Sequence, residues 1–119
     1  MKTLKPRPAA PRRRILLVDD HPMMITGMTT LLNRQPDLEV CADAGDAAEA
    51  KRKLLACRCD LVVTDLTLPG TGGLELIKDI AALHPGLPVL VISMHDEMLY
   101  AERALRAGAR GYLMKEAGG

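Results

Sequence analysis

The chain has 119 residues, which is enough for one domain with a single core. Apolar residues make up 48% of the sequence, but it has no Trp or Phe, so the core must be aliphatic. No apolar run reaches the roughly eighteen residues that a membrane span requires. The basic N-terminus is not followed by an apolar stretch, as it would be in a secretory signal. These features exclude a membrane-spanning protein and predict a soluble domain.

Positive charge is concentrated at the N-terminus. The formal net charge is +1, but residues 1–14 hold six basic residues and no acid, so the remainder carries a formal −5. Three prolines interrupt the basic residues. We therefore expect residues 1–13 to form a disordered, solvated leader rather than an arm that binds nucleic acid.

The cysteines are Cys41, Cys57 and Cys59. Their odd number and irregular spacing argue against a disulfide framework and favour a reducing compartment, which predicts a cytoplasmic protein. No second Cys or His pair at ligand spacing accompanies them, so we expect reduced thiols rather than a metal site.

In chain order, the first half of the sequence predicts two strands, each followed by a helix, and then a third strand. An unbroken apolar run over residues 15–18 is typical of a strand buried on both faces. Pro22 suits the first turn of a helix, whose apolar stripe would be Met24, Met28, Leu31 and Leu32. A short strand over residues 38–42 follows. Asp46 and Glu49 have the spacing of a capping box for the next helix, and residues 60–65 form the third strand.

The second half continues this alternation. A loop over residues 68–73 leads into a helix that ends at residues 84–86. Residues 89–92 form a fourth strand, Asp96 is a candidate cap for the helix after it, and Gly108 is a natural stop. A last strand covers residues 111–114. Alternating strands and helices predict an α/β fold with a doubly wound, flavodoxin-like parallel sheet of five strands in the order 2-1-3-4-5. We expect residues 14–119 to form this domain with its final helix missing, leaving part of one sheet face uncovered.

Charged and hydroxyl residues gather at the predicted strand ends. In such sheets, ligands bind at the carboxyl ends of the strands where the strand order reverses, here between the first and third strands. Asp19, Asp20 and Asp65 would lie there, flanked by Ser93 and Lys115. Clustered carboxylates repel one another, and a hard cation such as Mg²⁺ relieves that repulsion. An Asp carboxylate can also act as a nucleophile toward phosphorus.

The motifs at these strand ends resemble the receiver domain of two-component response regulators. They are residues 18–22 (VDDHP), 63–70 (VTDLTLPG) and 108–115 (GARGYLMK), in the order of that family. The resemblance covers roughly residues 14–116. The first and last motifs are similar to the NarL/FixJ (LuxR-type) subfamily in particular.

The resemblance implies a role for each matched residue. Asp65 would be the phosphoacceptor, and Asp20 and Asp65 would bind Mg²⁺, with Asp19 nearby and the backbone carbonyl of Thr67 as a further ligand. Lys115 would pair with the phosphoryl oxygens. Ser93 and Tyr112 occupy the hydroxyl and aromatic switch positions, although Tyr112 is almost as easily read as half-buried packing. His21 and His95 adjoin the site, and we interpret both as loop residues rather than ligands.

The resemblance also implies partners. A sensor histidine kinase would donate the phosphoryl group, and the chain would not be an enzyme beyond its own phosphorylation and dephosphorylation at Asp65. An output domain outside this chain would bind DNA and regulate transcription, a homodimer is a further expectation, and no membrane is involved.

Three other functions compete with this interpretation. A phosphatase of the haloacid-dehalogenase type needs a second Asp two residues after the nucleophile, where this chain has Thr67. A nucleotide-binding protein needs a Gly-rich turn where Asp19 and Asp20 stand. The stronger alternative is a receiver-like module that binds proteins independently of phosphorylation.

Overall fold

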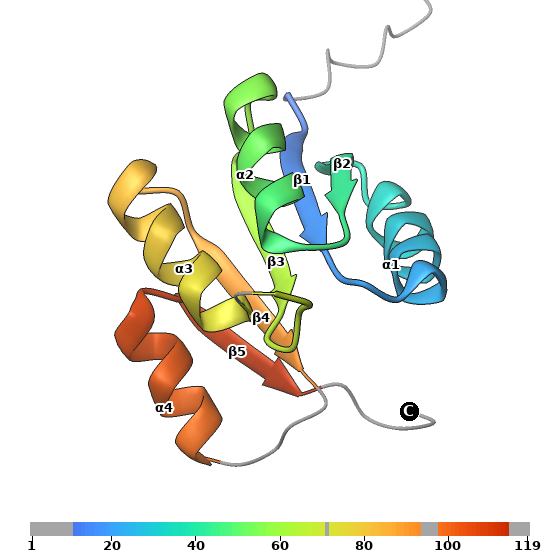
Figure 1. Cartoon of the computed structure of the whole chain (residues 1–119). Helices are drawn as coiled ribbons and strands as arrows, with labels where there is room; N and C mark the ends of the chain where they lie inside the picture. Colours follow the sequence, from blue (N-terminus) through green and yellow to red (C-terminus); the bar gives the residue numbers. More distant parts are fainter. Residues whose placement is uncertain (1–10, 71, 94–97, 115–119) are drawn as a thin grey trace, which may run out of the picture.

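The computed structural model describes residues 11–70, 72–93 and 98–114, in which strands and helices alternate (Figure 1). The elements in chain order are β1 (Arg13–Val18), α1 (Pro22–Asn33), β2 (Leu38–Ala44), α2 (Ala47–Ala56), β3 (Leu61–Asp65), α3 (Gly72–Leu83), β4 (Val89–Ser93), α4 (Met98–Ala107) and β5 (Gly111–Met114). Most of the predicted leader lies outside the described residues. None of the helices described is long and apolar enough to cross a membrane.

The strands form one sheet in the order β2-β1-β3-β4-β5, and every neighbouring pair is parallel. This confirms the predicted order. The strand order reverses between β1 and β3, because β2 lies on one side of β1 and all later strands lie on the other side. The carboxyl ends of all five strands therefore meet at one edge, where β1 and β3 are neighbours.

Each face of the sheet has its own apolar cluster, because successive side chains of a strand point to opposite faces. Leu16 and Val18 of β1 belong to the larger cluster, which includes residues of α2, α3 and α4. Ile15 and Leu17 belong to the smaller cluster, which packs against α1. Figure 1 shows α1 on the opposite side of the sheet from α2 and α3.

Helix α1 covers only part of its face. No residue of α1 is fully buried. Ile25, Met28 and Leu32 pack on the sheet, whereas Leu31 is 61% exposed, so its predicted place in the buried stripe was wrong. The inner stripe runs from Ile25 to Met28, three residues later, and then to Leu32, four residues after that. Leu31 lies one position before Leu32 and is therefore outside this stripe. On the same face, Leu90 of β4 is only partly buried.

The start of α2 confirms the predicted cap. Asp46 Oδ1 accepts a hydrogen bond of 2.8 Å from the backbone N–H of Glu49, and Glu49 Oε1 accepts one of 2.8 Å from the N–H of Gly45. These contacts satisfy amide groups that have no partner within the helix. The predicted cap at Asp96 lies outside the described residues.

Candidate functional site: an acidic group at the carboxyl edge of the sheet

Three carboxylates meet where β1 and β3 end. Asp19 and Asp20 directly follow β1, and Asp65 is the last residue of β3, so the parallel pairing of these two strands brings the three side chains to one place. Asp19 and Asp65 are buried, with 7% and 5% of their surface exposed, whereas Asp20 faces solvent. Ligand atoms of the three acids and of His21 all lie within 4.8 Å of one another. We call these four residues the acidic group.

The imidazole of His21 lies against the three acids. Its Nδ1 is 2.6 Å from Asp19 Oδ1, 3.2 Å from Asp20 Oδ1 and 3.9 Å from Asp65 Oδ2. The backbone N–H of His21 also donates to Asp19 Oδ1, at 2.9 Å. An ionised carboxylate accepts but does not donate, so a hydrogen bond from the ring to Asp19 would require a proton on Nδ1. His21 precedes Pro22 at the first turn of α1, and this position holds the ring over the site.

The loop after Asp65 folds back onto the end of β3. The N–H of Thr67 donates to Asp65 Oδ1 at 3.2 Å, and the N–H of Gly73 donates to the carbonyl of Leu66 at 2.9 Å. A Cβ at position 73 would lie 2.4 Å from the Leu66 carbonyl oxygen and 2.7 Å from that of Asp65. Only glycine therefore lets α3 begin this close to the strand that carries Asp65.

Two other predicted site residues lie on the neighbouring strands. Ser93 is the last residue of β4 and is fully buried, and Ile92 before it pairs with Asp65. Tyr112 of β5 pairs with Val91 and packs, half-buried, against the larger apolar cluster. Met114 pairs with Ser93. Lys115, the next residue, lies outside the described residues, as does His95.

The donor set of the acidic group fits a hard divalent cation. Carboxylate oxygens from two strand ends converge, and two of the three acids are removed from water, where their mutual repulsion is strong. Mg²⁺ prefers oxygen ligands of this kind and usually keeps several waters. The exposed Asp20 leaves the group open to solvent on one side.

Comparison with known proteins places this arrangement in a family. The model of the response regulator receiver domain family matches residues 15–118 of this chain. This chain belongs to that family. The finding confirms the family predicted from the three motifs, and receiver domains of this kind act in two-component phosphoacceptor signalling.

Relatives of the receiver domain point to the NarL and LuxR type. The chain is 38% identical over 103 residues to the oxygen regulatory protein NreC of Staphylococcus epidermidis, covering 86% of the chain and 47% of the relative. It therefore spans about half the length of the curated relatives it matches. A two-component response regulator of the LuxR family from Aurantimonas is 42% identical, with a TM-score of 0.85 over 89% of this chain and 76% of that one. The NarL signal receiver domain of Mycobacterium tuberculosis is 30% identical, with a TM-score of 0.85 over 91% and 87%.

Two features of the site were missed from the sequence. His21 lies outside the helix and beside the site, as the sequence predicts, but the contact of its ring with the acids is not predicted. Its position between Asp20 and the helix-starting Pro22 is the available signal. The sequence predicts Gly73 only as part of a loop, and its close approach to the end of β3 has no signature in the sequence.

Proposed function

We propose that the receiver domain is a phosphorylation switch, with Asp65 accepting a phosphoryl group from the phosphohistidine of a sensor histidine kinase. A carboxylate oxygen of Asp65 forms the new bond to phosphorus, the bond from phosphorus to the histidine nitrogen breaks, and that nitrogen keeps the electron pair. The observation that carries this proposal is the convergence of Asp65 with two further acids at the switch point of the sheet. Beyond this self-modification, and later loss of the phosphoryl group to water, we propose no enzymatic activity.

We propose that Asp20 and Asp65 hold Mg²⁺, with Asp19 acting nearby and the carbonyl of Thr67 as a further ligand. Bound there, the ion would neutralise charge on the phosphoryl oxygens. Oδ1 of Asp19 accepts a hydrogen bond from the backbone N–H of His21 and lies 2.6 Å from the ring Nδ1 of the same residue, which supports a positioning role for this acid. The contact from the Thr67 N–H keeps one Asp65 oxygen oriented toward the loop.

Transmission of the signal is proposed to run through β4 and β5. Lys115 would pair with the phosphoryl oxygens, the Ser93 hydroxyl would move toward them, and Tyr112 would change its packing against the larger apolar cluster. Ser93 ends the strand next to β3, and Tyr112 is half-buried at the same face as α4, which supports this route. The event is a local change of charge that biases the packing of a surface.

The output is proposed by relation to the longer relatives. A DNA-binding domain outside this chain would regulate transcription in the cytoplasm, and homodimers would form through the receiver domain. No contact with a membrane is proposed.

Phosphorylation by a small-molecule donor tests the proposal. The purified chain would be incubated with acetyl phosphate and Mg²⁺ and its intact mass measured. We expect a gain of one phosphoryl group that requires Mg²⁺ and disappears in Asp65→Asn. Asp37→Asn is the matched control, because Asp37 is exposed and precedes β2, at the opposite edge of the sheet. No mass gain in the folded wild-type chain would instead favour the module that binds proteins without phosphorylation.

A further inference from the structure

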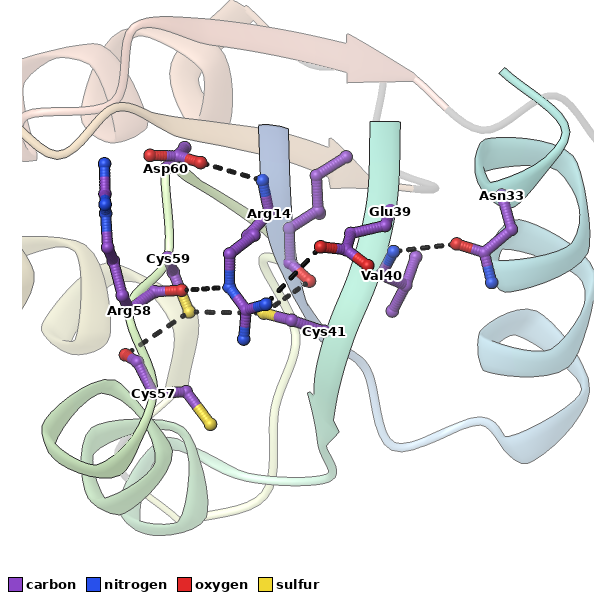
Figure 2. A network of polar contacts seen from close by, with 10 residues as sticks. Arg14, Asn33, Glu39, Val40, Cys41, Cys57, Arg58, Cys59 and Asp60 are labelled. Atoms are coloured by element: carbon purple, nitrogen blue, oxygen red, sulfur yellow. Dashed lines mark hydrogen bonds and ion pairs between the residues drawn. The ribbon is translucent and has the colours of Figure 1, made fainter. Parts of the chain in front are cut away.

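Cys41, within β2, and Cys59, just before β3, lie side by side (Figure 2). Sγ of Cys41 lies 3.5 Å from Sγ of Cys59. Each thiol also contacts a carbonyl oxygen: Cys41 Sγ is 3.4 Å from that of Ile15, and Cys59 Sγ is 3.8 Å from that of Cys57. All three cysteines are free and partly exposed. We call Cys41 and Cys59 the thiol pair.

A bulge in β2 creates the thiol pair. Ile15 of β1 pairs with Val40, but the next residue of β1 pairs with Ala42, so Cys41 is an extra residue in β2. Val40 packs on the α1 side of the sheet and Ala42 on the α2 side. The bulge at Cys41 therefore changes the face of the sheet to which the following side chains of β2 point. The thiol of Cys41 reaches Cys59, which packs on the α2 side.

The two cysteines lie on chain segments that an intervening strand separates. Cys41 belongs to β2 and Cys59 leads into β3, and β1 lies between these strands. Neighbouring strands are about 4.8 Å apart, so backbones two strands apart are separated by roughly twice that distance. A disulfide needs Cα atoms within about 7 Å. The pair can therefore hold an atom between its sulfurs more readily than it can form a direct bond.

A positive charge accompanies the thiol pair. The guanidinium of Arg14 is fixed by a 2.7 Å hydrogen bond from Nε to the carbonyl of Arg58 and by a 3.4 Å ion pair with Glu39 (Figure 2). Burial, and then the hydrogen bond with Cys41, raise the pKa of the Cys59 thiol, and the charge of Arg14 acts in the opposite direction. Negative charge that develops on the sulfurs would therefore be partly compensated within the same network.

We propose that Cys41 and Cys59 form a binding site for a soft monovalent cation of the Cu(I) class. Both thiols lose their protons to solvent, and each sulfur forms one bond to the ion, so the loaded pair carries one net negative charge facing Arg14. Thiolate ligands select soft ions such as Cu(I), which is stable with two ligands. Zinc requires four. In the described part of the chain, no third His, Cys or acidic ligand atom lies within 4.8 Å of both sulfurs, which favours the two-coordinate ion.

Copper titration tests this site. Reduced protein would be titrated anaerobically with Cu(I) against a chromogenic Cu(I) chelator, and the reactive thiols would be counted with a disulfide reagent. We expect one Cu(I) bound per chain and a fall from three reactive thiols to one. Cys41→Ser and Cys59→Ser should each abolish binding. Cys57→Ser is the matched control and should bind as the wild type does, because Cys57 adjoins the pair without completing it.

Further measurements keep the test decisive. Urea unfolding of each variant establishes that lost binding is not lost folding, and Cys41→Ala and Cys59→Ala replace any serine variant that unfolds. Asp65→Asn should bind Cu(I) normally, which separates this site from the proposed phosphorylation. The proposal is overturned if the chelator removes all the copper from wild-type protein. It is equally overturned if Cys57→Ser loses binding, or if a Cys41→Ser, Cys59→Ser double variant retains it.

Discussion

Replacing Gly73 with alanine should destabilise the domain at the point where the proposed phosphoacceptor strand ends. The new Cβ would lie 2.4 Å from the carbonyl oxygen of Leu66 and 2.7 Å from that of Asp65. Both obstacles are backbone atoms, so no side chain can rotate away, and α3 must move off β3. The same movement stretches the 2.9 Å hydrogen bond from the Gly73 N–H to the Leu66 carbonyl.

The magnitude follows from these two contacts. Overpacking of a tight site costs about 1–3 kcal/mol, and a lost backbone hydrogen bond adds about 1 kcal/mol. We expect the free energy of unfolding to fall by about 2–4 kcal/mol. With a denaturant slope of about 2 kcal/mol per molar urea, the unfolding midpoint should fall by about 1–2 M. The rate of Mg²⁺-dependent phosphorylation should also fall, because Asp65 is carried by the displaced backbone.

Urea unfolding followed by circular dichroism measures the first effect, and intact mass after acetyl phosphate treatment measures the second. Gly27→Ala is the matched control. Gly27 lies within α1, no atom lies within 4 Å of the position its Cβ would take, and its φ angle is not positive. That change should therefore raise stability by about 0.5–1 kcal/mol. Equal midpoints for Gly73→Ala and the wild type would refute the reasoning.

Three further predictions concern α2 and the thiol pair. Asp46→Ala removes the acceptor for the Glu49 N–H and should lower the free energy of unfolding by about 1 kcal/mol in urea titrations, whereas an unchanged midpoint would show that the cap contributes nothing. Leu54→Ala should cost about 2–4 kcal/mol because Leu54 is 8% exposed, but Leu55→Ala, at 83% exposure, should change the midpoint little; similar losses for both would contradict the assigned burial. Burial, and then the hydrogen bond with Cys41, raise the pKa of Cys59 from 9.0 to about 12. The protonated thiol is thus favoured in the folded state, and the stabilisation this gives is complete below pH 9 and is lost as the pH rises toward 12. Mass mapping should find Cys59 alkylated more slowly at pH 9 in folded than in urea-unfolded protein, and equal rates would disprove the shift.

The sequence by itself determined the order of the elements and the strand order of the sheet. The apolar runs of this chain are short and unbroken, as strands buried on both faces require, and alternating helices allow only parallel crossovers. This information is local, because it depends on the spacing of residues within one segment. The same is true of the cap at Asp46 and of the acids at the ends of β1 and β3, which their motifs place at strand ends.

Only the tertiary structure decided which side chains touch. Leu31 matched the helical period but faces solvent, because the face of α1 that is buried depends on how the helix lies on the sheet. His21 contacts three acids through the turn into α1, and Gly73 touches the end of β3 through a folded loop. Cys41 reaches Cys59 only because a bulge turns β2 over, and the residues are 18 positions apart along the chain. Spacing fixes the direction of a side chain within its own element, but contact between elements depends on register and packing, which no single segment encodes.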